Sequence, residues 1–210
     1  IAHTLLLTDN HCVYAWGSNM LGQLGLGDKI DRATPSLVES LNRNFVDEIY
    51  CGGGHSLVID QKGLVYSWGA GAHYQTGHRK NKIEATPKLI DGLQDDDIVS
   101  AACGVSHTAL LTAEGKILTF GNNEHGQCGD GNFGQGCLKK FPEKLHFFEG
   151  NTVEAVSCGG AHTLVLLRDQ TVYGFGLNRH GQLGLGHYEN YPKPEMVVSL
   201  RHKGVEYIQC

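Results

Sequence analysis

Short hydrophobic runs alternate with polar residues along the chain, and tight polar turns join successive runs in pairs. Residues 55–60 (HSLVID) and 64–69 (LVYSWG) are joined by QKG, and residues 107–112 (HTALLT) and 116–121 (KILTFG) are joined by AEG. Runs of this length that are rich in Val, Leu, Ile and aromatic residues are typical of short β-strands. No segment has a sustained helical period with capping residues at its ends. The pattern therefore predicts an all-β chain.

The turn between paired strands also has a preferred residue. Gly63 and Gly115 stand where a positive φ is expected, and a residue with a Cβ atom costs about 1–2 kcal/mol there. His11 and Gln170 occupy the same position in two other pairs, so the preference for glycine is not absolute.

The paired runs repeat with a period of about 52 residues. An aromatic–glycine pair recurs at spacings of 52, 52 and 55, and a histidine recurs at the same spacings. A cysteine recurs at spacings of 52, 55 and 52. The aromatic residues are Trp16, Trp68, Phe120 and Phe175, the histidines are His3, His55, His107 and His162, and the cysteines are Cys51, Cys103, Cys158 and Cys210. This register divides residues 1–210 into units 1–50, 51–102, 103–157 and 158–210. Units of this length with about four short strands are typical of β-propeller blades.

The third unit is three residues longer than the others. Pro35, Pro87 and Pro194 each follow the repeat aromatic residue by 19 positions, whereas Pro142 follows it by 22. The gap from each proline to the next repeat cysteine is 16 in all four units, so the insertion lies between Gly131 and Pro142.

Several motifs at fixed offsets carry a family resemblance. Residues 51–69 (CGGGHSLVIDQKGLVYSWG), and WGSNMLGQLGLGD at 16–28 with a proline seven residues later, closely resemble the regulator of chromosome condensation (RCC1-like) repeat. The resemblance covers essentially all 210 residues and implies a β-propeller, normally of seven blades, each a four-stranded antiparallel sheet. Only four repeats are present here, so we expect an open arc of about four blades with a long gap between Ile1 and Cys210. The end faces of the arc are expected to meet further blades of the parent chain or of another molecule.

The repeat positions themselves are expected to build the scaffold. We expect the four repeat histidines to be buried imidazoles bonded to the backbone of a neighbouring blade. Cys51, Cys103 and Cys158 are expected to be buried free thiols, and the repeat aromatic residues to fill blade cores. The hexapeptide GQLGLG, at 22–27 and again at 181–186, lacks the helix that follows a phosphate-binding loop. We interpret its glycines as blade corners, with Leu24 and Leu183 filling the core.

Composition and charge limit the classes of function. The net charge of −5 disfavours direct contact with nucleic acid, and no apolar run approaches the roughly 18 residues of a membrane span. Seven cysteines without a CxxC pair favour an intracellular, reducing compartment, the cytoplasm or nucleus. No secretory signal peptide is recognisable at the N-terminal end.

Catalytic and metal-binding patterns are weak. His125, Cys128, Cys137 and His146 could supply two nitrogens and two thiolates, but their spacing matches no common zinc module. No Ser-His-Asp or Cys-His-Asn set can be assembled without free choice among scattered residues. We therefore expect no metal, no other cofactor and no enzymatic activity.

Candidate partner-binding residues lie where a unit departs from the repeat. The insertion and the strand after it contain Phe133, Lys139, Lys140, Phe141 and Lys144, and Phe147 and Phe148 follow. Aromatic residues beside lysines are suited to binding a protein partner. The alternative is a loop that folds over its own blade. In the second unit, GQLGLGDKI becomes YQTGHRKNKI, which leaves a basic run of Arg79, Lys80 and Lys82. This run is either a solvated loop or an anion site.

These features predict a non-enzymatic protein-interaction scaffold that serves as the regulatory or targeting module of a larger protein. The alternative, which the family resemblance implies, is a guanine-nucleotide exchange factor for a Ran-like small GTPase. It requires a protruding wedge and acidic residues that cannot be assigned here. A further resemblance, to the plant ultraviolet-B photoreceptor, requires clustered tryptophans. We exclude that function because only Trp16 and Trp68 are present, both at blade-core positions.

Overall fold

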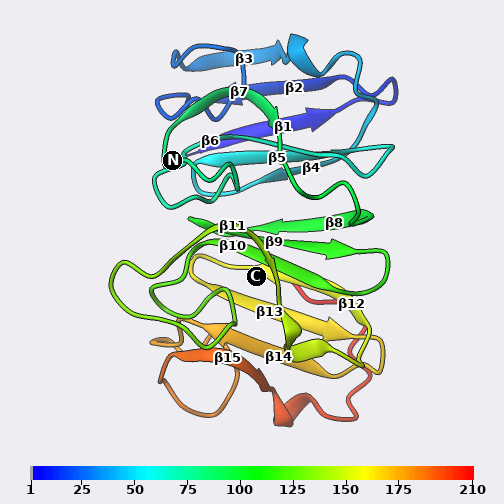
Figure 1. Ribbon diagram of the computed structural model, residues 1–210, viewed down its shortest axis with the longest axis vertical. Coiled ribbons are helices and arrows are strands. Elements are labelled where there is room, and N and C mark those ends of the chain that lie inside the picture. The colour runs from blue at the N-terminus through cyan, green and yellow to red at the C-terminus, as the bar shows by residue number, and fades with distance from the viewer. Residues whose placement is uncertain (1) are drawn as a thin grey trace.

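The computed structural model describes residues 2–210, which form four antiparallel sheets that follow one another along the long axis of the molecule (Figure 1). The first sheet contains β1 (His3–Leu7), β2 (Val13–Gly17) and β3 (Arg32–Leu37). The second contains β4 (Val46–Cys51), β5 (His55–Asp60), β6 (Val65–Gly69) and β7 (Glu84–Leu89). The third contains β8 (Ile98–Cys103), β9 (His107–Thr112), β10 (Ile117–Asn122) and β11 (Leu138–Lys144). The fourth contains β12 (Val153–Cys158), β13 (His162–Leu167), β14 (Val172–Gly176) and β15 (Tyr191–Met196).

The strands in each sheet follow their order along the chain, as expected for propeller blades. Three short 3₁₀ helices follow the last strand of the first, third and fourth blades: η1 (Glu39–Leu41), η2 (His146–Phe148) and η3 (Val198–Leu200). The predicted all-β class is confirmed. The turn prediction is also confirmed, because His11, Gly63, Gly115 and Gln170 all have positive φ, between 61° and 75°.

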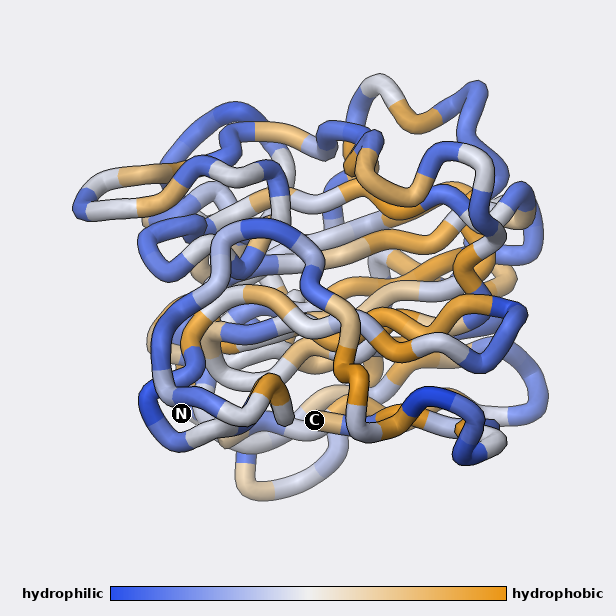
Figure 2. Tube along the Cα trace, turned by 90° about the horizontal axis from the view of Figure 1, so that it is seen from below, coloured by the Kyte–Doolittle hydropathy of each residue, from blue (hydrophilic) through white to orange (hydrophobic). Residues whose placement is uncertain are grey.

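The hydrophobic core lies between neighbouring blades. Separate buried clusters join the first blade to the second, the second to the third, and the third to the fourth. In Figure 2, hydrophobic residues concentrate along the strands and hydrophilic residues on the connecting loops. Trp68 is buried against Gly25 of the preceding blade, where an added Cβ would lie 2.8 Å from Trp68 Nε1. The glycines of the hexapeptide therefore permit blades to approach closely, as predicted.

Packing between sheets runs from each blade to the next, and the first and fourth sheets lie at opposite ends of the molecule (Figure 1). Residues 205–210 have the sequence register of β4, β8 and β12 but form no strand. Val205 and Ile208 pack against the fourth blade, and the Cys210 backbone N–H donates to Ser157 Oγ at 2.9 Å. The predicted open arc is confirmed, while its gap to Ile1 lies outside the described residues. Within residues 2–210, no helix has the length and hydrophobicity needed to cross a membrane.

Candidate partner-binding surface

A hydrogen-bond relay at the repeat histidines links each blade to the next. His3 Nε2 donates to Ser56 Oγ of the following blade at 2.8 Å, and Ser56 Oγ donates to the Gln23 carbonyl at 2.7 Å. The same relay is repeated by His55, Thr108 and Gln75, and by His107, Thr163 and Gln127, with distances of 2.8–3.0 Å. Because the single hydroxyl proton goes to the carbonyl, each histidine must carry its own proton on Nε2.

The predicted histidine contact needs one correction. His3, His55 and His107 do contact the neighbouring blade, but each bonds to a hydroxyl side chain and not to the backbone. His162 forms no such bond within residues 2–210, and His3 and His162 are half-buried, so the predicted burial holds only for His55 and His107. The hydroxyl lies between the ring and the nearest backbone carbonyl, so the backbone is reached only through it. Burial lowers the pKa of His55 and of His107 to about 3, so both rings are neutral at pH 7.

The repeat cysteines are free thiols, as predicted, but they are less buried than predicted. Cys51 is exposed, and Cys103 and Cys158 are half-buried. Each ends the first strand of its blade, which is an edge strand of its sheet, so no strand covers one side of it. Burial of the sulfur still raises the pKa of Cys103, so this thiol is a weak nucleophile at neutral pH.

The four candidate zinc ligands lie too far apart to form one site. Cys128 and Cys137 lie in the connection between β10 and β11, whereas His146 follows the far end of β11. Seven strand residues separate Cys137 from His146, which corresponds to about 23 Å of extended chain. Across residues 2–210, no group of three or more His, Cys, Asp or Glu side chains is arranged to hold a metal ion.

The two departures from the repeat, which lie in different blades, contact each other. The guanidinium carbon of Arg79 lies 4.2 Å from the centre of the Phe141 ring, and Lys140 Nζ lies 5.9 Å from the centre of the Tyr74 ring. The Arg79 N–H also donates to the Lys140 carbonyl at 3.2 Å. Blade two thus supplies one cation and one aromatic ring, and blade three supplies the other two. We call these four residues the clasp.

The clasp is strained compared with the other units. Tyr74 has a φ of 61° and Arg79 a φ of 58°, at repeat positions that hold glycine in the three other units. Each such residue costs about 1–2 kcal/mol relative to glycine, whereas an exposed cation–π contact contributes about 0.5–1 kcal/mol. The same loop buries Thr76 Oγ1 and His78 Nδ1 without a partner within residues 2–210. Stability alone therefore does not explain why this loop departs from the repeat.

The clasp also concentrates positive charge on a chain of net charge −5. Arg79, Lys80, Lys82 and Lys140 are all exposed. Lys82 Nζ lies 3.2 Å from a carboxylate oxygen of Glu84, but no ion pair in the described part of the chain involves the other three cations. We call the clasp together with Lys80 and Lys82 the clasp surface.

The residues of the insertion are divided between different surroundings. Phe133 is 62% exposed in the β10–β11 connection, which projects beyond the strand ends (Figure 1). Lys139 is only 6% exposed, with Nζ 3.6 Å from Asp130 and 3.3 Å from Glu143, so it supports the loop from inside. Lys144 lies at the other end of β11, where it pairs with Asp96 at 2.8 Å. At the clasp end of β11, a partner can therefore reach Phe133, Lys140 and the half-buried Phe141, whereas Lys144 and Phe147 are exposed at the opposite end of the strand.

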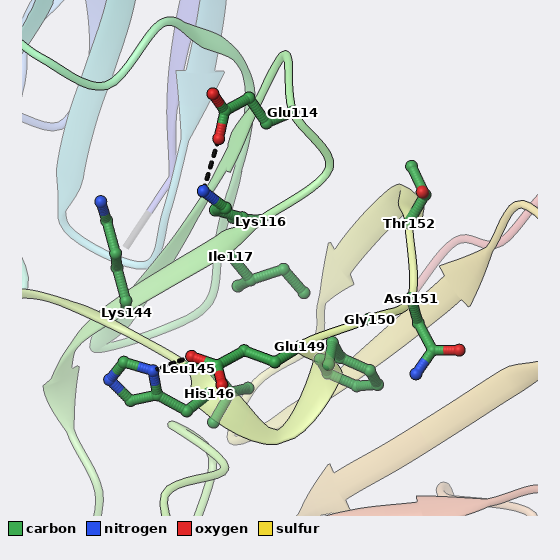
Figure 3. A pocket seen from close by; sticks show the side chains of 11 residues that line it. Glu114, Lys116, Ile117, Lys144, Leu145, His146, Glu149, Gly150, Asn151 and Thr152 are labelled. Carbon is green, nitrogen blue, oxygen red and sulfur yellow. Dashed lines mark hydrogen bonds and ion pairs between the residues drawn. The ribbon is translucent and has the colours of Figure 1, made fainter.

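A groove of about 420 Å³ lies at the opposite end of the third blade (Figure 3). Ile117, Leu145 and Phe148 are its apolar lining residues, and the charged side chains at its rim already have partners: Glu114 pairs with Lys116, and Lys144 pairs with Asp96 outside the groove. His146 pairs with Glu149 in the same way. Because the charged groups at the rim are already paired, they favour no particular ligand charge. Sequence reasoning did not identify this groove, and the only signal for it is the HFF triplet at 146–148.

Comparisons with known proteins agree with the repeat assignment. A family model described as "RCC1-like domain" matches residues 1–210. "Ultraviolet-B receptor UVR8" of Arabidopsis thaliana is 34% identical over 210 residues, which cover 100% of this chain and 47% of that protein. "Probable E3 ubiquitin-protein ligase HERC6" of Homo sapiens is 37% identical over 218 residues, which cover 99% of this chain and 20% of that protein. The chain thus spans less than half of either curated relative.

Two solved structures share the fold. Human WBSCR16 matches with a TM-score of 0.84 and 27% identity, covering 100% of this chain and 55% of that one. Prp20p of Saccharomyces cerevisiae, whose structure was described together with its binding to Gsp1p and histones, matches with a TM-score of 0.81 over 93% of this chain and 48% of that one. Its 21% identity establishes the likeness of fold alone.

Proposed function

Because the chain belongs to the RCC1-like domain family, we propose that it is a non-enzymatic protein-interaction scaffold whose clasp surface binds a protein partner. The observation that carries this proposal is the meeting of two departures from the repeat at one exposed place, where they add strain and unpaired charge. Residues that serve only the fold are expected to follow the repeat, as the histidine relay does.

Further observations support binding in preference to chemistry. The repeat histidines that are fully buried are neutral and are committed to the relay, and burial raises the pKa of the buried Cys128 thiol. HERC6 contains the matching region within a fifth of its length, which supports the role of a regulatory or targeting module in a larger protein. Seven free thiols support a reducing compartment, the cytoplasm or nucleus.

A light-receptor function has little support in spite of the similarity to UVR8. Trp68 is buried between blades and donates its indole N–H to the Gln23 carbonyl at 2.8 Å. Trp16 holds the equivalent position in the first blade, but it is half-buried and joins no core cluster of the described residues, so the predicted core position is wrong for this ring. The two tryptophans still lie in separate blades and do not form one surface cluster.

Site-specific crosslinking tests the proposal. A photo-crosslinking amino acid replaces Lys80 in the full-length parent protein, and a matched variant carries it at Lys62, an exposed lysine in the β5–β6 turn at the other end of the same blade. We expect crosslinking in cells to give a discrete partner band from position 80 that is missing from position 62. Identical bands from both positions, or no band from either, would contradict a binding role for the clasp surface.

The exchange-factor alternative is tested separately with purified proteins. A Ran-type GTPase loaded with a fluorescent guanine nucleotide is mixed with the parent protein, and nucleotide release is followed over time. The scaffold proposal expects release at the intrinsic rate. Nucleotide release that accelerates as the parent protein is added would reject the scaffold proposal and favour an exchange factor.

A further inference from the structure

We propose that the clasp surface recognises an anionic peptide segment, one that carries closely spaced carboxylate or phosphate groups. This inference rests on the proposed function and adds the chemistry of the partner. It starts from Arg79, whose guanidinium lies over the Phe141 ring at 4.2 Å. Stacking of one guanidinium face on a ring leaves the N–H groups at its edge free to bind a carboxylate or phosphate through two hydrogen bonds.

The positions of the cations favour a ligand with more than one negative charge. The backbone bond from Arg79 to Lys140 holds two cations of different blades together, and Lys80 follows Arg79 directly in the chain. No acidic side chain neutralises these three within the residues that the structure describes. An arginine and two lysines fixed at one blade junction form a compact positive surface, and such a surface raises both the association rate and the selectivity for acidic partners.

The surroundings favour a peptide over a nucleic acid. Glu84 and Glu143 lie on the strands that flank the clasp, where they pair with Lys82 and Lys139, so the unpaired positive charge does not continue along a path that a long phosphate backbone could follow. Single-stranded nucleic acids also need open aromatic faces on which bases stack. Here the cations already lie over the Tyr74 and Phe141 rings. A short anionic segment satisfies the cations without requiring either feature.

The test uses fluorescence polarisation with four labelled probes and the whole chain. The probes are a short peptide rich in Asp and Glu, the same peptide with Asn and Gln in their place, a peptide whose only charged groups are two phosphoserines, and a short single-stranded DNA of matched charge. We expect the acidic or the phosphorylated peptide to bind at least ~10-fold more tightly than the amide peptide, with an affinity that falls as salt rises. The ratio of the two anionic affinities distinguishes carboxylate from phosphate as the natural source of charge.

Two variants with equal changes in charge locate the site. The clasp variant carries R79G and K140S, and position 79 then holds the glycine found in the other units, so the fold is kept. The control variant carries K62S and R168S, which remove two exposed cations from turns at the other end of the blades. We expect the clasp variant to lose at least ~10-fold in affinity for the anionic peptide, and the control variant to keep it.

Three results would overturn the inference. They are equal binding of the anionic and amide peptides, equal losses in the two variants, and tighter binding of a short single-stranded DNA of matched charge. A partner that crosslinks at position 80 while no anionic peptide binds would leave the proposed scaffold function intact and reject only this partner chemistry. Absence of both signals would reject the two together.

Discussion

Replacing Thr108 by valine tests whether the histidine relay holds neighbouring blades together. The Thr108 hydroxyl accepts from His55 Nε2 and donates to the Gln75 carbonyl, both at 2.9 Å, and its side chain is fully buried. Valine has nearly the same shape, so the change removes two hydrogen bonds without opening a cavity. It leaves one buried donor and one buried acceptor unpaired, each at a cost of about 1–3 kcal/mol.

The junction between the second and third blades is sensitive to this change, because both the donor and the acceptor of the hydroxyl lose their partner. The equivalent carbonyl at the previous junction, Gln23, also accepts from the Trp68 indole and so keeps one partner if Ser56 is changed. Gln75 has no such second donor, because Phe120 stands at the equivalent position. We therefore expect Thr108→Val to lower the free energy of unfolding by about 2–6 kcal/mol.

The assay is thermal unfolding followed by circular dichroism, with Thr4→Val as the matched control. Thr4 holds the same repeat position in the first blade, but it is exposed and its hydroxyl forms no hydrogen bond within residues 2–210. For a chain of this size, a loss of about 2–6 kcal/mol lowers Tm by about 4–24 °C. The control should change Tm by less than about 2 °C, since exposed substitutions usually cost under about 0.5 kcal/mol. Equal Tm values for the two variants would refute the reasoning.

Three other predictions concern the scaffold. Burial lowers the pKa of His55 and His107 to about 3, so between pH 6.5 and 3 the unfolded chain binds more protons than the folded chain. As the pH falls through that window, the free energy of unfolding should decrease by about 1.4 kcal/mol per histidine per pH unit. A urea midpoint that is equal at pH 7 and pH 5.5 would contradict this. Gly126→Ala should destabilise the chain by more than about 2 kcal/mol in urea, because its φ is 82° and an added Cβ would lie 2.3 Å from the next blade's backbone. In the control variant Gly160→Ala, the added Cβ would have no atom of a non-neighbouring residue closer than 3.9 Å, so the free energy of unfolding should not change. Iodoacetamide should alkylate the buried Cys128 at least about 100-fold more slowly in the native chain than in urea, and mass spectrometry of the labelled peptide measures both rates.

The fold could be predicted because three residue types repeat in one register, and that register fixes where each strand begins. The histidine contact was predicted between the correct blades but to the wrong kind of group. The residue after each histidine offered a signal, since Ser56, Thr108 and Thr163 all carry a hydroxyl. A repeat alignment alone does not say which side chain of the next blade reaches the ring, because that depends on the stagger between blades.

The clasp could be predicted only in parts. Both departures from the repeat were visible in the sequence, but their contact depends on which residues of β11 lie opposite the β6–β7 connection. Strand parity also decides that Lys140 is exposed while Lys139 is buried, because successive side chains point to opposite faces. The insertion just before β11 hides this parity in the sequence, so all the lysines there appear equivalent.

The histidine relay makes the blades interchangeable. Each junction takes a histidine and a glutamine carbonyl from one unit and a hydroxyl from the next, and it does not depend on which two units meet. Excision of residues 51–102 would join Tyr50 to Cys103 within a single strand and bring His3 opposite Thr108, so that the relay is rebuilt at the new boundary. A deletion that ends within a unit and removes its histidine or its hydroxyl would instead leave a relay partner unpaired. Such a chain can gain or lose blades in evolution only as whole units, because the three groups of the relay recur once in every repeat.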